Sequence, residues 1–128
     1  MKTCLRLSVS GICGLVFAFV VLGEARADRI ARWEVPSNVS GCSLAGARLT
    51  LRPDGTASWF GVVNSIYRDD AYCVTLTFLN SGGRKLFSWP RFCSQTLWQH
   101  PQVWTNNNLA FPVGQFNSIA IVTKRDHC

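Results

Sequence analysis

Acid–base and nucleophilic chemistry would depend on very few side chains in this sequence. The two histidines are His100, which stands next to Pro101, and His127, which follows Asp126. A hydrolase would combine such an imidazole with a carboxylate and a nucleophile in the manner of a catalytic triad. No spacing links such a set here. The sequence therefore favours a protein that is not an enzyme, with a small hydrolase as the alternative.

Asp69 and Asp70 are adjacent carboxylates, and they follow Arg68. Glycoside hydrolysis needs two carboxylates that face one cleft, whereas adjacent residues in a strand point to opposite faces. At a loop tip both could face a cation, but the regular spacing of oxygen ligands in a calcium loop is missing. We interpret residues 68–70 as a charged loop tip, and we expect neither a metal nor a cofactor.

Four of the six cysteines lie in the C-terminal hundred residues, and they constrain the fold most strongly. Cys42, Cys73, Cys93 and Cys128 are an even set in a short chain, for which two disulfides are the usual explanation. A zinc site would need closely spaced ligands, yet there is no Cys-x-x-Cys and the histidines do not stand at ligand spacing. Four cysteines allow three pairings. The choice between them depends on the strands.

Aromatic residues are unusually frequent: five Trp, two Tyr and six Phe follow residue 27. We expect Trp59, Phe78 and Phe87 in the core. Trp98 and Trp104 lie in a polar segment rich in Gln and Asn, where they could line a ligand pocket or a partner surface, or could cover the open end of the fold. Together with the loop tip they are the candidate ligand-binding residues: Trp98, Trp104, Arg68, Asp69 and Asp70.

The N-terminus has the pattern of an export signal. A lysine and an arginine precede an uncharged apolar run over residues 7–22, and small residues stand one and three places before Asp28. The run is shorter than the roughly 20 residues of a spanning helix. We predict a cleaved signal over residues 1–27 and one domain over residues 28–128. The mature protein would be periplasmic or secreted, without a membrane span.

The charge of residues 28–128 is mildly positive. Ten lysines and arginines stand against six acids, which gives a net charge near +4. A balance of this size indicates solubility rather than nucleic-acid binding. We therefore expect a monomer whose partner is a small ligand or a protein and not a nucleic acid.

Apolar residues after the signal repeat with a period of two, which is typical of strands. Over residues 45–51 Ala45, Ala47, Leu49 and Leu51 alternate with polar or small residues. The turn signal Pro53-Asp54-Gly55 follows, and residues 56–64 return. This pair is predicted to be a hairpin.

A second hairpin is predicted from residues 71–79, a turn at Asn80–Gly83, and a return over residues 85–92 in which Pro90 limits pairing. A turn centred on Gly82-Gly83 places Cys73 opposite Phe92 or Cys93. The register therefore predicts a Cys73–Cys93 disulfide and leaves Cys42 for Cys128. The second bridge would close nearly the whole domain and stabilise it by roughly 4 kcal/mol in the chain-entropy model.

The rest of the chain is less regular. We expect residues 94–115 to form long loops with one short strand, and residues 118–124 to form a central strand that is buried on both faces. About six strands would then form an antiparallel all-β meander, which must hide its edges as a small closed barrel or as a β-sandwich. Consecutive hairpins favour the barrel.

A set of short motifs runs along the domain. They are the segment from Cys42 to Gly46, Thr50-Leu51, Asp54-Gly55-Thr56-Ala57, Phe60-Gly61-Val62-Val63-Asn64-Ser65, Asp69-Asp70-Ala71 and the closing His127-Cys128. In this combination the chain resembles a group of small exported bacterial proteins classed as a domain of unknown function. The resemblance implies export and β architecture, and it assigns no activity.

The leading functional hypothesis is an exported, non-enzymatic binding protein that presents Trp98, Trp104 and the tip at residues 68–70 to a small ligand or a protein. One alternative is a small exported hydrolase that uses His100 or His127. The other is a structural protein associated with the cell envelope.

Overall fold

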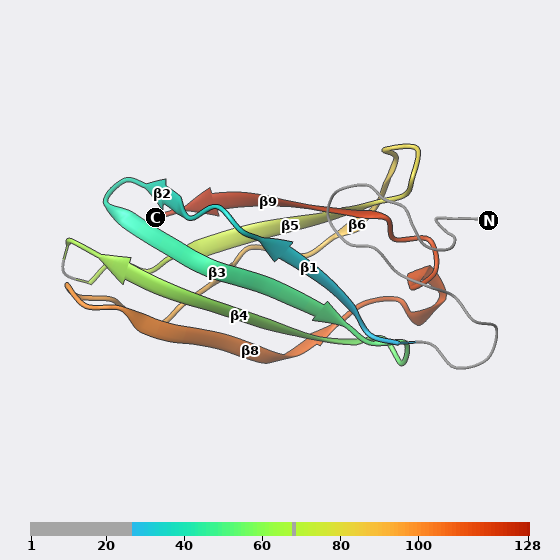
Figure 1. Ribbon diagram of the computed structural model, residues 1–128, viewed down its shortest axis with the longest axis horizontal. Coiled ribbons are helices and arrows are strands. Elements are labelled where there is room, and N and C mark those ends of the chain that lie inside the picture. Colours follow the sequence, from blue (N-terminus) through green and yellow to red (C-terminus); the bar gives the residue numbers. More distant parts are fainter. Residues whose placement is uncertain (1–26, 68) are drawn as a thin grey trace.

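The computed structural model in Figure 1 describes residues 27–67 and 69–128. The expected signal, residues 1–27, lies outside the described residues except for Ala27, and so does Arg68. Within the described ranges the chain is all-β, as the period of two predicted, with nine strands and one short 3-10 helix. No helix in this part of the chain is long and apolar enough to cross a membrane.

The strands form two antiparallel sheets. Their bounds are β1 (Arg29–Trp33), β2 (Ser37–Val39), β3 (Cys42–Leu51), β4 (Thr56–Ser65), β5 (Cys73–Leu79), β6 (Lys85–Ser88), β7 (Phe92–Cys93), β8 (Gln102–Ala110) and β9 (Ile121–His127), and the 3-10 helix is η1 (Val113–Gln115). One sheet has the order β1–β3–β4–β8, with β2 also paired to β3. In the other, β5 lies between β9 on one side and β6 and β7 on the other.

The strands of both sheets run along the long axis of the molecule (Figure 1). Among the described strands no pairing joins one sheet to the other. The expected closure into a barrel is therefore not confirmed.

Trp59 on β4 lies where the two sheets meet. Its ring centre is 5.6 Å from that of Phe92 on β7 and 5.3 Å from that of Trp104 on β8. Leu76 and Phe78 of β5 are buried in the same cluster. The apolar faces of the two sheets therefore cover each other and share one core, which holds Trp59 and Phe78 as predicted.

A bulge in β3 changes the expected face of one residue. The pairing of β3 with β4 shifts register between Ala45 and Arg48, and Gly46 has a φ of +63°. An extra residue in a bulge reverses the alternation of the side chains. Leu44 and Ala47 are therefore buried, three residues apart, whereas Ala45 is only half-buried, although the simple alternation grouped it with Ala47.

The second hairpin and both disulfides agree with the prediction. Thr77 pairs with Ser88, Phe78 with Phe87, and Cys73 with Cys93. The returning segment is divided into β6 and β7 around Pro90, which cannot donate to a ladder. The disulfides are Cys73–Cys93 and Cys42–Cys128.

The C-terminal half differs from the expectation in two strands. Residues 102–110 form the nine-residue strand β8 where one short strand among loops was expected, because the polar residues of β8 lie on a sheet edge where they stay in water. The expectation of a central strand over residues 118–124 is wrong. In its place β9 pairs with β5 alone, and Val122 is its one fully buried residue.

Arg29 joins the N-terminal strand to the turn before β9. It is buried, and its Nη1 donates hydrogen bonds to the carbonyl oxygens of Phe116 at 2.6 Å and Ile119 at 2.7 Å. The guanidinium carbon also lies 4.6 Å from the centre of the Phe116 ring. A buried arginine with such partners replaces the water that the two carbonyls would otherwise bind.

We expect Arg29→Met to lower the free energy of unfolding by about 2–4 kcal/mol, because two buried carbonyls lose a charged donor. Arg32→Met on the exposed side of the same strand is the control and should change it by less than about 0.5 kcal/mol. Urea unfolding with both disulfides intact measures the two effects. Equal losses in the two variants would contradict a structural role for Arg29.

Candidate functional site

Three loops meet at the end of the molecule that lies on the left of Figure 1. Backbone hydrogen bonds run from Ile66 to the carbonyl of Gly41 at 3.1 Å and from Gln99 to that of Ser65 at 2.7 Å. A third runs from Leu97 to the carbonyl of Asp70 at 2.7 Å. We call this region the loop end; its members are residues 40–41, 65–67, 69–71 and 94–101.

Large apolar side chains are exposed at the loop end. Ile66 is 59% exposed, Tyr67 55% and Trp98 39%. Among the described residues, Tyr67 and Trp98 are the only aromatic residues with this degree of exposure. Single exposed apolar residues are common, but several on loops that are bonded together indicate an interaction surface.

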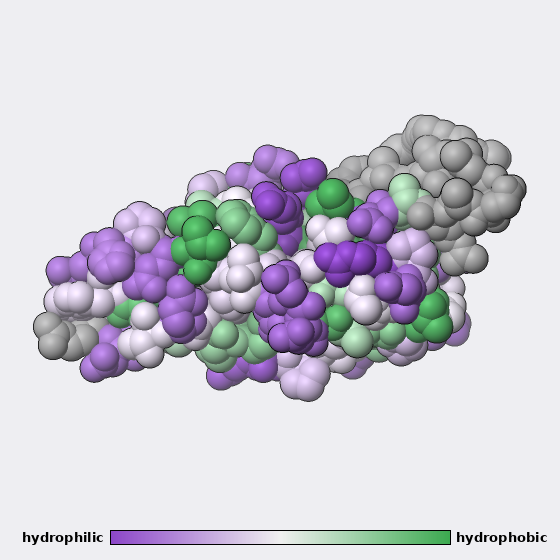
Figure 2. All heavy atoms as spheres, turned by 90° about the horizontal axis from the view of Figure 1, so that it is seen from below, coloured by the Kyte–Doolittle hydropathy of each residue, from purple (hydrophilic) through white to green (hydrophobic). Residues whose placement is uncertain are grey.

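The side of the molecule that carries β8 is different in character. Figure 2 shows it as a mixture of hydrophilic and hydrophobic residues rather than one continuous apolar patch. Val103 of β8 is exposed there as a single valine. This face therefore has no grouping of exposed aromatic rings comparable to that of the loop end.

The backbone of the loop end is held in costly conformations. Ser40, Asp69 and Gln99 have φ values of 48°, 67° and 53°, and they are the non-glycine residues with positive φ in the described part of the chain. One lies in each of the three loops. Such conformations cost roughly 1–3 kcal/mol each and persist where the surroundings enforce them, often at functional sites.

Side-chain contacts hold the loop of residues 65–70 in place. A Cβ added to Gly41, which has a φ of 85°, would lie 2.6 Å from Cε2 of Tyr67, so the ring rests directly on the glycine backbone. The Oγ of Ser65 accepts a hydrogen bond from the Tyr67 amide at 3.0 Å and donates one to Oδ2 of Asp70 at 3.3 Å. Tyr67 is thus exposed but fixed.

The structure brings only some of the expected site residues together. Trp98, Asp69 and Asp70 lie in the loop end, and Arg68 is outside the described residues. Trp104 does not lie there, since it is 3% exposed and packs in the core. It faces inward from β8, where it is paired with Gly61 of β4.

Ile66 and Tyr67 were not among the expected site residues. The one signal in the sequence is that two apolar residues precede the charged tip in a segment between two strands.

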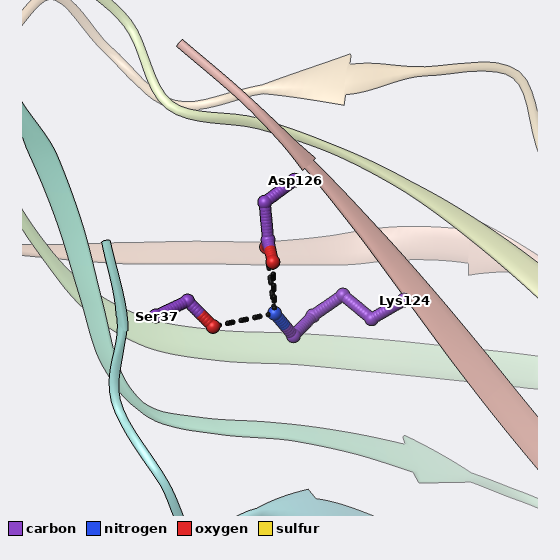
Figure 3. A network of polar contacts seen from close by, with 3 residues as sticks. All are labelled: Ser37, Lys124 and Asp126. Atoms are coloured by element: carbon purple, nitrogen blue, oxygen red, sulfur yellow. Dashed lines mark hydrogen bonds and ion pairs between the residues drawn. The ribbon is translucent and has the colours of Figure 1, made fainter. Parts of the chain in front are cut away.

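A buried polar cluster lies between β2 and β9, as Figure 3 shows. The side chain of Lys124 is 4% exposed and donates to both carboxylate oxygens of Asp126, at 2.6 and 2.8 Å, and to Oγ of Ser37 at 3.0 Å. A serine next to a lysine can be a nucleophile and its base. Here three acceptors occupy the three protons of the ammonium group, so Lys124 acts as a donor that joins the two sheets.

The histidines do not form the pairs that a hydrolase needs. Neighbouring residues in a strand face opposite sides, so Asp126 points into the fold and His127 points out. His127 Nδ1 lies 3.2 Å from Nη2 of Arg91. His100 is exposed in the loop end. In the described part of the chain neither imidazole forms an ion pair or hydrogen bond with a carboxylate.

The grouping of possible metal ligands within the described ranges consists of Cys42, Asp70 and Cys128. The two sulfurs are bonded to each other in the disulfide, which leaves one carboxylate oxygen as a donor. A zinc or calcium site needs several protein ligands. The group therefore does not fit a metal ion while the disulfide is formed.

Tyr72, which precedes β5, is fully buried close to the polar cluster of Ser37, Lys124 and Asp126. Burial, and to a smaller extent the charge of Asp126, raises the pKa of its hydroxyl far above the usual value of 10. The phenol therefore stays protonated in the folded protein at a pH where an unfolded tyrosine has ionised.

We expect the stability of the protein to fall as the pH rises above 10, because the unfolded chain then releases a proton that folded Tyr72 keeps. The fall should be less steep in Tyr72→Phe and unchanged in Tyr67→Phe, which alters the exposed tyrosine. Urea unfolding at several pH values between about 8 and 11 measures how steeply the free energy of unfolding falls with pH in each protein. Identical slopes in all three proteins would exclude Tyr72 as the cause.

Comparison with known proteins gives a family and no activity. No curated protein and no solved structure is significantly similar to this chain. A model described as "Family of unknown function (DUF6294)" matches residues 48–128, which include the end of β3 from Arg48 onward, all of β4 to β9 and the loop end apart from residues 40–41. This agrees with the expected resemblance to a domain of unknown function. The chain belongs to the DUF6294 family, a family of unknown function.

Proposed function

We propose that this chain is an exported, non-enzymatic binding protein whose loop end is the contact surface for a protein partner. The observation that carries the proposal is the exposure of Ile66, Tyr67 and Trp98 on loops that are bonded to one another. Aromatic side chains of this kind dominate the binding energy of protein interfaces.

A protein partner fits this surface better than a small ligand does. Small-molecule sites are concave and bury most of the ligand. The three side chains, by contrast, are 39% to 59% exposed and stand on loops at the end of the fold. Rings that project outward can insert into a depression on a partner, where they become desolvated.

The rigidity of the loops supports the same conclusion. Binding is weakened by the entropy that is lost when loops become ordered. Here the positive-φ residues and the bonds of Ser65 already hold Tyr67 in one place. The Cys42–Cys128 disulfide additionally joins the start of β3, next to Gly41, to the C-terminus. Most of the conformational entropy of these loops is therefore already lost in the free protein, and little more is lost on binding.

Export is part of the proposal. It is supported by the pattern of residues 1–27, with cleavage after Ala27. Two disulfides are also compatible with an oxidising compartment. The alternative of a hydrolase has no comparable support, because no histidine–carboxylate pair is formed in the described ranges.

A photo-crosslinking amino acid placed at Tyr67 tests the site in the producing cell. We expect one defined crosslinked protein from position 67, and none from Val113 on η1, which is similarly exposed (56%) and lies against Gly55, at the end of β4 opposite to the loop end. Mass spectrometry of the adducts identifies the partner. The same adducts from both positions, or none from either, would contradict the proposed surface.

Once the crosslinked partner has been identified and purified, Tyr67→Ala and Trp98→Ala should each weaken its binding by about 10- to 30-fold, as expected for interface hot spots. Val113→Ala should leave the affinity unchanged. Calorimetry measures the affinities, and thermal unfolding of each variant shows that the fold is kept. Wild-type affinity in the first two variants would remove these residues from the site.

A further inference from the structure

The Cys73–Cys93 disulfide crosses from β5 to β7 on the outer face of its sheet. Val74 is buried in the core, so its neighbour Cys73 points outward, and Cys93 is the residue directly opposite. Cys93 is exposed and Cys73 is half-buried. An incoming thiol can therefore reach the sulfur of Cys93 without unfolding of the core.

The guanidinium of Arg91 lies beside this disulfide. His127 on β9 lies directly opposite Cys73 on the other side of β5. Arg91 stands just before β7, yet its Nη2 lies 3.2 Å from Nδ1 of His127. The arginine side chain must therefore cross β5 on the outer face, beside Cys73.

Two further charged side chains of β9, Arg125 and Asp126, lie on opposite faces of its sheet. Arg125, opposite Thr75, lies on the same outer face as His127, because the two residues are two apart on β9. Asp126, which stands between Arg125 and His127, points its carboxylate to the inner face, where it binds Lys124. The outer face next to the disulfide is therefore electropositive.

The second disulfide has the opposite surroundings. Cys42 is buried, and the sulfur of Cys128 lies 3.8 Å from Oδ2 of Asp70. A carboxylate disfavours a thiolate that forms next to it, whereas a guanidinium favours one. One chain thus carries two disulfides in contrasting environments.

We propose that Cys73–Cys93 is a thiol-exchange site, at which a thiol of a small molecule or of a protein attacks Cys93. The attacking thiolate forms a bond with the sulfur of Cys93, the bond between the two cysteines breaks, and its electron pair leaves with Cys73 as a thiolate. Arg91 stabilises that thiolate, and a better leaving group makes exchange faster.

A second thiolate completes the reaction by attacking the other sulfur of the mixed disulfide, the one that came from the first thiol. It displaces Cys93 as a thiolate, so two thiols are oxidised to one disulfide while Cys73 and Cys93 are reduced. This inference does not depend on the proposed binding function, because it concerns a different face of the molecule.

The test exposes the oxidised, exported protein to reduced glutathione, traps free thiols with iodoacetamide, and maps the products by mass spectrometry. We expect glutathione on Cys93 first, a free thiol on Cys73, and an intact Cys42–Cys128 bridge. Glutathione on Cys73, or earlier opening of Cys42–Cys128, would overturn the proposal.

Arg91→Gln tests the electrostatic part. It should slow the first exchange by at least about threefold, because the leaving thiolate loses its positive neighbour. Arg84→Gln, in the exposed turn before β6, removes the same charge away from the site and should leave the rate unchanged. Thermal unfolding checks that both variants are folded. Equal rates in both would show that the charges around Cys73 do not promote exchange, and would overturn the proposal.

Discussion

The structure depends on the burial of one aromatic cluster between two sheets. Each sheet has one apolar face, and neither face can remain in water at acceptable cost. Trp59 contacts rings from β7 of one sheet and β8 of its own, so it fixes the relative position of the two layers. Because interiors are close-packed, a shift of one sheet would disturb every ring in the cluster.

Rigid packing of the sheets explains why the loop end can hold unusual backbone conformations. The loops begin and end on strands that are fixed by the core, and hydrogen bonds close them at their bases. The favourable energy of the core offsets the cost of positive φ at Ser40, Asp69 and Gln99. A surface of exposed apolar side chains is thereby kept in one arrangement, which is the condition for specific contact with a partner.

Two charged side chains are buried inside the fold. Arg29 and Lys124 are buried at different places, and each donates to oxygen atoms that would otherwise be unsatisfied. Buried charges are tolerated only with such partners. The charges near the two disulfides differ in sign, and this difference comes from the face of the strand on which each neighbour lies rather than from its distance along the chain.

The sequence by itself determined the local features of this protein. The period of two in residues 71–79, the turn at Asn80–Gly83 and the break at Pro90 predicted the hairpin and, through its register, the Cys73–Cys93 pair. These features depend on residues close in the chain, where turn chemistry and alternation leave few choices.

Only the tertiary structure decided which side chains are exposed and which lie together. Trp98 and Trp104 stand in the same polar segment, yet one is 39% exposed in a loop and the other 3% exposed opposite Gly61. Likewise, nothing local placed Tyr67 on the backbone of Gly41. The direction of a side chain depends on pairing between distant strands, and the energy of that pairing is not contained in any short stretch of sequence.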